Sequence, residues 1–184
     1  NICEHVHLAV QSGSNKILRA MRRGYTREGF LKLVERIKKA IPGVNITTDV
    51  IVGFPGEEEE DFEATLSLIK EARFGTVYVA AYSVRPGTPA EPLGDPVSPA
   101  EKARRLQEVL ALTREIALEI HRKKIGSTVE VLVEEYMEEK GLVMGKTREF
   151  RTVLLSGGPE LVGRLVEVEI ASATPAALLA EIKE

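Results

Sequence analysis

The chain has 184 residues, of which 43% are hydrophobic and 29% charged. These proportions are typical of a globular protein of one or two domains, and the lack of any run of about 18 apolar residues excludes a helical membrane span. The formal net charge is −3. Residues 1–124 contain 19 basic and 17 acidic residues, and residues 125–184 contain 6 basic and 11 acidic ones. Neither part is strongly basic, so bulk charge alone does not predict nucleic-acid binding.

The first half of the chain alternates between strand and helix patterns. Three stretches rich in apolar and β-branched residues predict strands: Val6–Val10, Asn45–Val52 and Thr76–Tyr82. Helical patterns occupy the segments Ser14–Met21, Thr26 to Pro42, and the stretch that opens with the acidic turn Glu57–Asp61. Their expected buried positions are Phe30, Leu33, Val34 and Ile37, then Phe62, Leu66 and Ile69. Three parallel strands cannot close a barrel, so we expect further βα units ahead of residue 1.

The second half changes from helical to alternating periodicity. A proline-rich linker, Ala90–Pro99, leads into the capping box Ser98-Pro99-Ala100-Glu101 and a long helix that runs to about Lys124 before Gly126. Five short strands are then predicted: Thr128–Glu134, Leu142–Thr147, Thr152–Leu155, Leu165–Ile170 and Leu178–Ile182. Their number and spacing indicate a small antiparallel barrel of the oligonucleotide-binding kind.

Two strand ends carry candidate ligand-binding residues. Gln11-Ser12-Gly13-Ser14 supplies an amide, two hydroxyls and backbone N–H groups that suit a ribose or a carboxylate; the alternative is that Ser12 or Ser14 only caps the next helix. Gly53-Phe54-Pro55-Gly56-Glu57 lacks the Gly-Lys-Ser/Thr of a phosphate loop and is followed by further glutamates. Its glycines suit a close approach to a flat ring such as adenine, and the alternative is a plain turn.

Histidines and basic residues form the remaining candidates. His5 and His7 lie on one face of a strand, as in a metal pair, but no further ligands are evident, so we expect a structural or substrate-facing role. There are two basic clusters: Arg19, Arg22 and Arg23, then Lys146, Arg148 and Arg151. The second has Phe150 among its members, and a basic strand face with an aromatic residue suits single-stranded RNA. Solvated surface is the alternative for both clusters.

Several long motifs, in order, carry a resemblance to a known family. They are His7 to Tyr25 with Gln11-Ser12-Gly13-Ser14-Asn15, then Ile46 to Glu57, then Tyr82-Ser83-Val84-Arg85-Pro86-Gly87-Thr88-Pro89-Ala90. The chain resembles the methylthiotransferase branch of the radical S-adenosylmethionine (SAM) enzymes, and its last part is similar to a TRAM domain. Gly145-Lys146-Thr147-Arg148 and Pro159-Glu160-Leu161-Val162-Gly163 fit the tRNA-modifying (MiaB-type) members better than the ribosomal-protein-modifying ones.

The resemblance implies a fold and a domain plan. We expect the C-terminal half of a (β/α)₆ radical-SAM partial TIM barrel over residues 1–97, a connecting helix over 98–124, and an OB-like TRAM barrel over 125–184. The implied cofactors are S-adenosylmethionine and, in the full-length parent, two [4Fe–4S] clusters. The single cysteine, Cys3, is too few to hold either cluster, so we expect the chain alone to be inactive and assign it no catalytic residue and no metal ligand.

The resemblance also assigns residues and partners. S-adenosylmethionine contacts are implied for Gln11, Ser12, Ile51, Val52, Gly53 and Tyr82, and RNA contacts for Arg22, Arg23, Lys146, Arg148 and Arg151. The implied partners are the tRNA anticodon stem-loop and a flavodoxin- or ferredoxin-type reductant. The resemblance also implies a cytoplasmic enzyme that does not bind a membrane. The alternatives are a ribosomal-protein-modifying methylthiotransferase and a non-catalytic RNA-binding module. Whether the target adenosine carries an isopentenyl or a threonylcarbamoyl group stays open.

Overall fold

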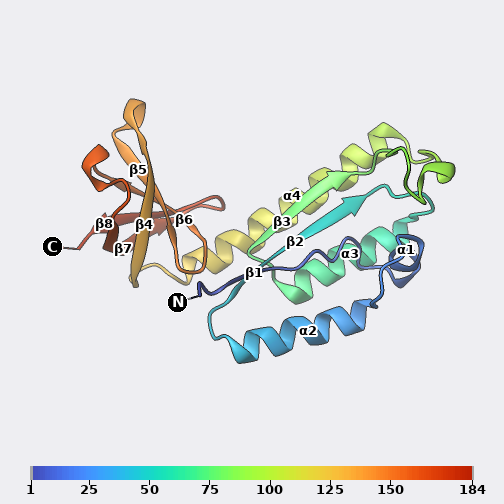
Figure 1. The fold of residues 1–184 in the computed structure, drawn as a ribbon, viewed down its shortest axis with the longest axis horizontal. Helices are drawn as coiled ribbons and strands as arrows, with labels where there is room; N and C mark the ends of the chain where they lie inside the picture. The colour runs from blue at the N-terminus through green and yellow to red at the C-terminus, as the bar shows by residue number, and fades with distance from the viewer. Residues whose placement is uncertain (1, 184) are drawn as a thin grey trace. The chain divides into compact units, whose positions relative to one another are not determined.

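A computed structural model describes residues 2–183 and divides them into two compact units (Figure 1). The α/β unit comprises Val6–Pro42 and Ile46–Thr113. The barrel unit runs from Arg114 to residue 183 and includes the short segments 2–5 and 43–45. Among the described residues, no helix is long and apolar enough to cross a membrane.

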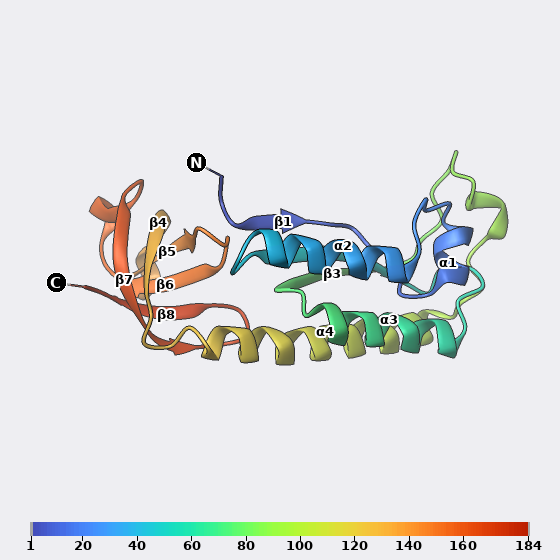
Figure 2. The same ribbon diagram turned by 90° about the horizontal axis from the view of Figure 1, so that it is seen from below.

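A sheet of three parallel strands forms the centre of the α/β unit, in the order β1-β2-β3. The strands are β1 (His5–His7), β2 (Asn45–Val52) and β3 (Thr76–Ala81), and β2 pairs with β3 from Thr47↔Thr76 to Val52↔Ala81. The helices are α1 (Asn15–Ala20), α2 (Arg27–Ala40) and α3 (Glu59–Ala72). Right-handed crossovers place α2 and α3 on the same face of the sheet, and Figure 2 shows the same arrangement. Among residues 2–183, no helix covers the opposite face of the sheet.

Side-chain caps begin each of these helices. The Ser14 hydroxyl accepts from the N–H groups of Lys16 and Ile17, and the Thr26 hydroxyl accepts from that of Gly29. At α3 the Glu58 and Asp61 side chains form a reciprocal capping box. The expectation that Glu57 begins the helix is wrong, because Glu57 lies before the cap and is buried.

Burial along α2 and α3 follows the sequence pattern at Phe30, Val34, Phe62 and Ile69 and departs from it elsewhere. Leu33, expected in the core, is 40% exposed, whereas Leu68, which was not expected there, is fully buried. Strand β1 is also shorter than Val6–Val10, since regular pairing stops at His7 and resumes as a single bridge between Gln11 and Val50. The largest buried side chains of the unit are Val10, Ile17, Leu18, Val50, Val52, Phe62, Leu68, Ile69 and Phe74.

Ser98 caps helix α4 (Pro99–Arg122), because its hydroxyl accepts from the Glu101 N–H at 3.2 Å, which is one of the two bonds of the predicted capping box. The Glu101 carboxylate bonds Arg104 and Arg105. The helix ends close to Gly126, which has a φ of 80°. The proline-rich segment before it contains one 3₁₀ turn, Glu91–Leu93, and two more lie in the barrel unit, Glu138–Lys140 and Pro159–Leu161.

The barrel unit contains a closed five-stranded barrel with the strand order β4-β5-β6-β8-β7. The strands are β4 (Thr128–Met137), β5 (Leu142–Thr147), β6 (Thr152–Ser156), β7 (Leu165–Ala173) and β8 (Leu178–Ile182). All neighbours are antiparallel except β6 and β8. Strands β4 and β7 extend beyond the predicted ends, past irregularities at Val133/Glu135 and Ile170/Ser172. The barrel core is Val131, Val133, Val143, Val153, Leu155, Val168, Ile170, Leu178 and Ala180.

Candidate cofactor and substrate cavity

A cavity of about 660 Å³ lies in the α/β unit, where the strands end. That volume is within the usual range of small-molecule sites. Its lining comes from Gln11 after β1, from Asp49 and Ile51 on β2, and from Tyr78 and Tyr82 on and after β3. The turn after α1 and the loop that leads to α4 complete the wall. Ligands of parallel α/β folds bind at this end of the sheet.

Gln11 is held at the cavity by its backbone. Its N–H donates to the Asp49 carbonyl at 2.8 Å and its carbonyl accepts from the Ile51 N–H at 2.9 Å. The residue has a φ of 70°, which is uncommon for any residue but glycine. The side chain is 7% exposed, and its amide makes no hydrogen bond to any residue that the structure describes. A strained backbone and an unpaired amide at a cavity wall are features of a ligand-binding residue.

The wall beside Gln11 is largely apolar. Val50, Ile51 and Val79 line it, and the Phe54 and Tyr82 rings meet edge to face, with centroids 5.1 Å apart and an interplanar angle of 72°. Apolar side chains with a few polar groups are the usual lining for a planar heterocycle. The cavity therefore suits an adenine ring at the strand ends.

Three residues expected at the cofactor do not line this cavity. Ser12 is fully buried, and its hydroxyl accepts from the Ser14 N–H at 3.1 Å and meets the Thr65 hydroxyl. Val52 is fully buried on the opposite side of β2 from Ile51, as strand alternation requires. Gly53 faces helix α4, where an added Cβ would lie 2.5 Å from Lys102 Cγ. The contacts of these three residues hold the strand ends in place, and none of the three lies in the cavity lining.

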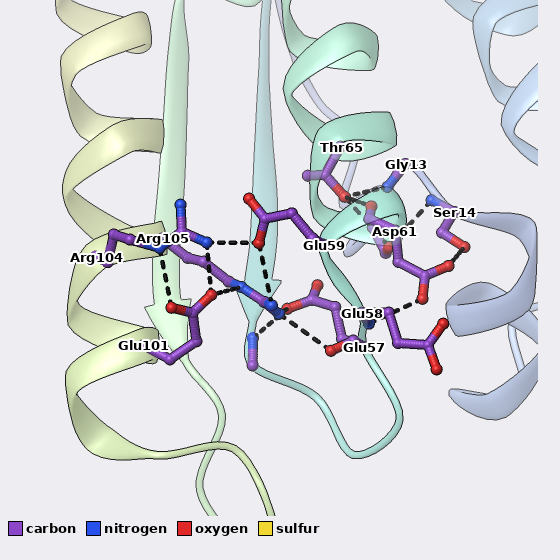
Figure 3. A network of polar contacts seen from close by, with 12 residues as sticks. Gly13, Ser14, Glu57, Glu58, Glu59, Asp61, Thr65, Glu101, Arg104 and Arg105 are labelled. Carbon is purple, nitrogen blue, oxygen red and sulfur yellow. Dashed lines mark hydrogen bonds and ion pairs between the residues drawn. The ribbon is translucent and has the colours of Figure 1, made fainter.

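A buried ion pair supports the turn after β2 (Figure 3). The Arg105 guanidinium donates to Glu57 Oε2 at 2.7 Å, and that oxygen also accepts from the Gly53 N–H at 2.5 Å. Both side chains are almost fully buried, and burial raises the pKa of Glu57 against the opposing effect of Arg105. Glu101 bonds both Arg105 and Arg104. The network fixes α4 to the end of β2.

A second set of contacts in Figure 3 supports the Gln11 loop. Ser14 Oγ donates to Asp61 at 2.6 Å, and the Gly13 N–H donates to Thr65 Oγ1 at 2.9 Å. Burial alone would raise the pKa of Asp61, but hydrogen bonds from Ser14, the Glu58 N–H and Lys16 outweigh it and leave the pKa below its usual value. The loop after β1 is thereby tied to the first turns of α3.

The helix-free face of the sheet carries His7 beside the cavity. Its Nδ1 lies 3.0 Å from Thr47 Oγ1 and its Nε2 lies 3.1 Å from Asp49 Oδ2, a cavity residue. The His7 and Tyr78 rings are 6.0 Å apart. His5, the other member of the pair, stacks on Phe150 at 5.0 Å. Over residues 2–183 no three His, Cys, Asp or Glu side chains come together in a way that could hold a metal ion.

The five residues expected to contact RNA fall into three settings. Arg22 and Arg23 line the cavity. Lys146 and Arg148 lie on the barrel unit, where Lys146 lies over the exposed Phe150 ring at 5.3 Å and Arg148 pairs with Glu4 at 2.9 Å. Arg151 is only 7% exposed; burial lowers its pKa, and its Nε has no hydrogen-bond partner among the described residues. Of the three barrel residues expected at RNA, Lys146 and Arg148 are therefore more accessible than Arg151.

The residues present fit one of the implied groups and not the other. Gln11, Ile51 and Tyr82 meet in a cavity of suitable size for S-adenosylmethionine, with an unpaired amide and an apolar wall. An iron–sulfur cluster has no ligand set here, because Cys3 is the sole cysteine and no metal-binding group of side chains occurs between residues 2 and 183. Sequence reasoning missed Asp49, Tyr78 and Arg85 as lining residues; the signal for Arg85 was the proline- and glycine-rich loop that follows β3.

The chain thus combines a parallel α/β unit, which carries a cavity at its strand ends, with a closed five-stranded barrel. Residues 1–69 match the radical SAM superfamily, and residues 122–183 match the TRAM domain. A solved structure of coproporphyrinogen III oxidase (HemN) from Escherichia coli, described as a radical SAM enzyme, aligns with 96% of the chain and 45% of its own, with a TM-score of 0.53 and 14% sequence identity. At that identity the likeness concerns the fold alone.

The first part of the chain is similar to the radical SAM superfamily, and curated relatives that the chain matches are tRNA-2-methylthio-N(6)-dimethylallyladenosine synthases. It is 49% identical to that synthase of Carboxydothermus hydrogenoformans over 92% of its length, and 47% identical to that of Pelotomaculum thermopropionicum over 94%. The synthase of Geobacillus thermodenitrificans is 47% identical over 99% of the chain. The chain spans 39%, 39% and 35% of these relatives.

Proposed function

We propose that the chain is the C-terminal part of a synthase that methylthiolates an adenosine next to the anticodon of tRNA. The observation that carries the proposal is continuous identity of 47% with one such synthase over 99% of the chain, which includes both units. A cavity that suits an adenosyl group and a barrel of the TRAM class support the same function. The relatives' names favour a dimethylallyl, that is isopentenyl, substituent on the target adenosine over a threonylcarbamoyl group.

S-adenosylmethionine is the cofactor that the cavity would hold. In this class of reaction it supplies an adenosyl radical and a methyl group. Gln11 would donate to or accept from its polar end, while Ile51 and the edge-to-face Phe54–Tyr82 pair would enclose the adenine and exclude water. The loops tied to α3 and α4 would keep these side chains in place before the cofactor arrives.

The chain by itself should not methylthiolate RNA. It has one cysteine, which is exposed, and the described residues offer no site for a cluster. The relatives are more than twice as long as the chain, which leaves room for cluster-binding segments and for contacts with a flavodoxin- or ferredoxin-type reductant. We therefore assign cofactor and RNA binding to this chain and the cluster chemistry to the rest of the synthase.

The proposal predicts a product that can be measured. Full-length protein with its clusters reconstituted should add a methylthio group to tRNA, detected by mass spectrometry of the tRNA nucleosides. The 184-residue chain added to the same tRNA should give none. A full-length protein that binds iron yet modifies a ribosomal protein, or modifies nothing, would contradict the proposed substrate.

Gln11→Ala tests the cofactor site without relying on turnover. S-adenosylmethionine binding to the 184-residue chain, measured by calorimetry, should weaken about tenfold, because a hydrogen bond to a charged ligand contributes about 1.5–3 kcal/mol. Gln107→Ala, at an exposed position on α4, is the matched control and should bind like the parent. Equal affinities for both variants would remove Gln11 from the site.

A further inference from the structure

The loop that joins β3 to α4 forms one side of the cavity (Figure 1). We call residues 83–97 the strap. Its lining residues are Ser83, Arg85, Thr88, Pro89 and Ala90. Apolar burial holds the strap only weakly, since Val84 is 39% exposed and Leu93 is 51% exposed. Loops with few buried contacts open at low cost in free energy, so polar contacts decide where the strap lies.

The strap is stiff between its ends. Its φ angles are restricted at four prolines, which are Pro86, Pro89, Pro92 and Pro96. A hydrogen bond within the strap adds to this, because the Gly87 N–H donates to Glu91 Oε2 at 2.8 Å. Near the far end Gly94 has a φ of 64°, a backbone conformation that favours glycine and suits a hinge. A stiff segment moves as one body, so the groups that hold its ends set its position.

A buried lysine of α4 holds both ends of the strap. The Lys102 side chain is 8% exposed, and its Nζ donates to the Tyr82 carbonyl at 2.8 Å and to the Asp95 carboxylate. Tyr82 directly precedes the strap, and Asp95 lies near its end. The ammonium also lies over the Tyr82 ring, 5.6 Å from the ring centroid, which is within the range of a cation–π contact. One amine thus fastens the strap at two points.

The aliphatic stem of Lys102 packs against the turn after β2. An added Cβ at Gly53 would lie 2.5 Å from Lys102 Cγ and 3.0 Å from Lys102 Cε, so a glycine leaves the room that the stem needs. The Tyr82 ring in turn meets Phe54 edge to face in the cavity wall. Lys102 does not line the cavity itself. It nevertheless connects three segments that do, which are the turn after β2, the end of β3 and the strap.

We propose that Lys102 is a positioning residue that keeps the strap closed over S-adenosylmethionine, and that its ion pair with Asp95 determines how long this ligand stays bound. The inference rests on the proposed function and deepens it, because it gives the cofactor site a movable wall. Charge-assisted hydrogen bonds are the stronger ones, which favours the closed strap. Asp95 is 40% exposed, so water solvates its carboxylate when the strap opens, while Lys102 keeps the Tyr82 carbonyl as a partner.

The test measures the association and dissociation rates of S-adenosylmethionine with the 184-residue chain. Asp95→Ala, in the exposed strap, should make dissociation about tenfold faster, since a hydrogen bond between charged groups is lost. Association should not be slowed, because the ligand enters while the strap is open. Lys102→Met should have at least the same effect, and adding Asp95→Ala to Lys102→Met should change nothing further, because the two residues form one interaction.

A second measurement needs no ligand. In Asp95→Ala the NMR order parameters of the strap amides should fall toward about 0.6, the level of flexible backbone, while those of β2 stay near about 0.85. Lys32→Met and Glu35→Ala, at exposed positions of α2, are the matched controls and should behave like the parent in both measurements. The proposal fails if the parent does not bind S-adenosylmethionine, if Asp95→Ala keeps the parental dissociation rate or order parameters, or if affinity is lost through slower association, as in a collapsed cavity.

These outcomes are separate from those of the proposed function. If the strap is wrong and the function right, the full-length protein produces methylthioadenosine in tRNA, while Asp95→Ala releases S-adenosylmethionine at the parental rate. If the function is wrong and the strap right, the full-length protein yields no such nucleoside, while the dissociation rate and the order parameters still depend on Asp95 and Lys102.

Discussion

At the scale of single residues, Gly13 shows how closely the loops of the α/β unit approach the helices behind them. A Cβ at this position would lie 2.5 Å from Thr65 Cα and even closer to the Ala64 carbonyl oxygen, both part of the α3 backbone. The Gly13 N–H donates to Thr65 Oγ1 at 2.9 Å, so the contact cannot open without loss of a buried hydrogen bond. Gly13 is therefore required by space, not by φ.

Gly13→Ala should lower the free energy of unfolding by about 1–3 kcal/mol, as overpacked sites do. Urea titration followed by circular dichroism measures the change. Gly24→Ala is the matched control, because nothing lies within 4 Å of the added Cβ. A loss of stability in the control equal to that at Gly13 would contradict the steric explanation.

Arg151 makes the opposite case, a charged residue whose removal should help. Its guanidinium is buried and its Nε unsatisfied among the described residues, which is costly in free energy. Arg151→Met keeps the length of the side chain and should stabilise the barrel unit by about 1–3 kcal/mol. Thermal unfolding measures this, with Arg148→Met, an exposed neighbour, for comparison. A drop in stability would mean that the charge is satisfied in solution.

At the scale of elements, local signals and tertiary packing explain different parts of the fold. The caps at Ser14, Thr26 and Ser98 could be predicted because each depends on a few adjacent residues. Leu33 and Leu68 could not, since which side of an apolar stripe is covered depends on the sheet behind it. The late strands of the barrel extend past their predicted ends because bulges, which carry no strong sequence signal, let pairing continue.

The lining of the cavity, like the fold, could be predicted only in part from the sequence. Gln11, Ile51 and Tyr82 line it, and Ser12, Val52 and Gly53 do not. Because side chains alternate between the two faces of a strand, Ile51 and Val52 were bound to lie on opposite sides of β2. The resemblance to a family motif, in contrast, gave both residues the same role. The buried partners of Ser12 and Gly53, Thr65 and Lys102, lie far away in sequence and become visible only in the fold.

The Glu57–Arg105 pair connects α4 to the end of β2, and its two charges depend on each other. Arg105→Met alone should destabilise the chain by about 3–5 kcal/mol, because it leaves a buried carboxylate unpaired, whereas Glu57→Gln with Arg105→Met should recover most of the loss. A double-mutant cycle in urea measures the coupling. Additive losses in the double variant would show that the two residues act independently.

At the scale of the whole molecule, two compact units imply two unfolding transitions rather than one. The barrel unit has its own acid sensitivity through His121, which is 5% exposed. Burial lowers its pKa below the ordinary 6.5, assisted by the nearby charges of Arg151 and Lys124 and opposed by a hydrogen bond to the Thr174 carbonyl. The fold therefore favours the neutral form of His121.

Because the folded pKa is the lower one, the stability contributed by neutral His121 is complete above pH 6.5 and is lost as the pH falls toward the folded value. Calorimetry between about pH 8 and about pH 5 spans the ordinary pKa of histidine. As the pH falls through this range, the unfolding temperature of the barrel unit should decrease. His121→Gln should flatten that shift and leave the other transition alone. An unchanged shift in the variant would assign it to other groups.

The strand order of the barrel makes its closure depend on strand β8. Strand β8 lies between β6 and β7 and closes the barrel by pairing with both. Any product that stops short of Leu178 has four strands with two unpaired edges and loses the parallel pairing of Val153 with Leu178. Loss of the segment 178–182 would thus turn a closed barrel into an open sheet, whose two unpaired edges favour pairing with other chains.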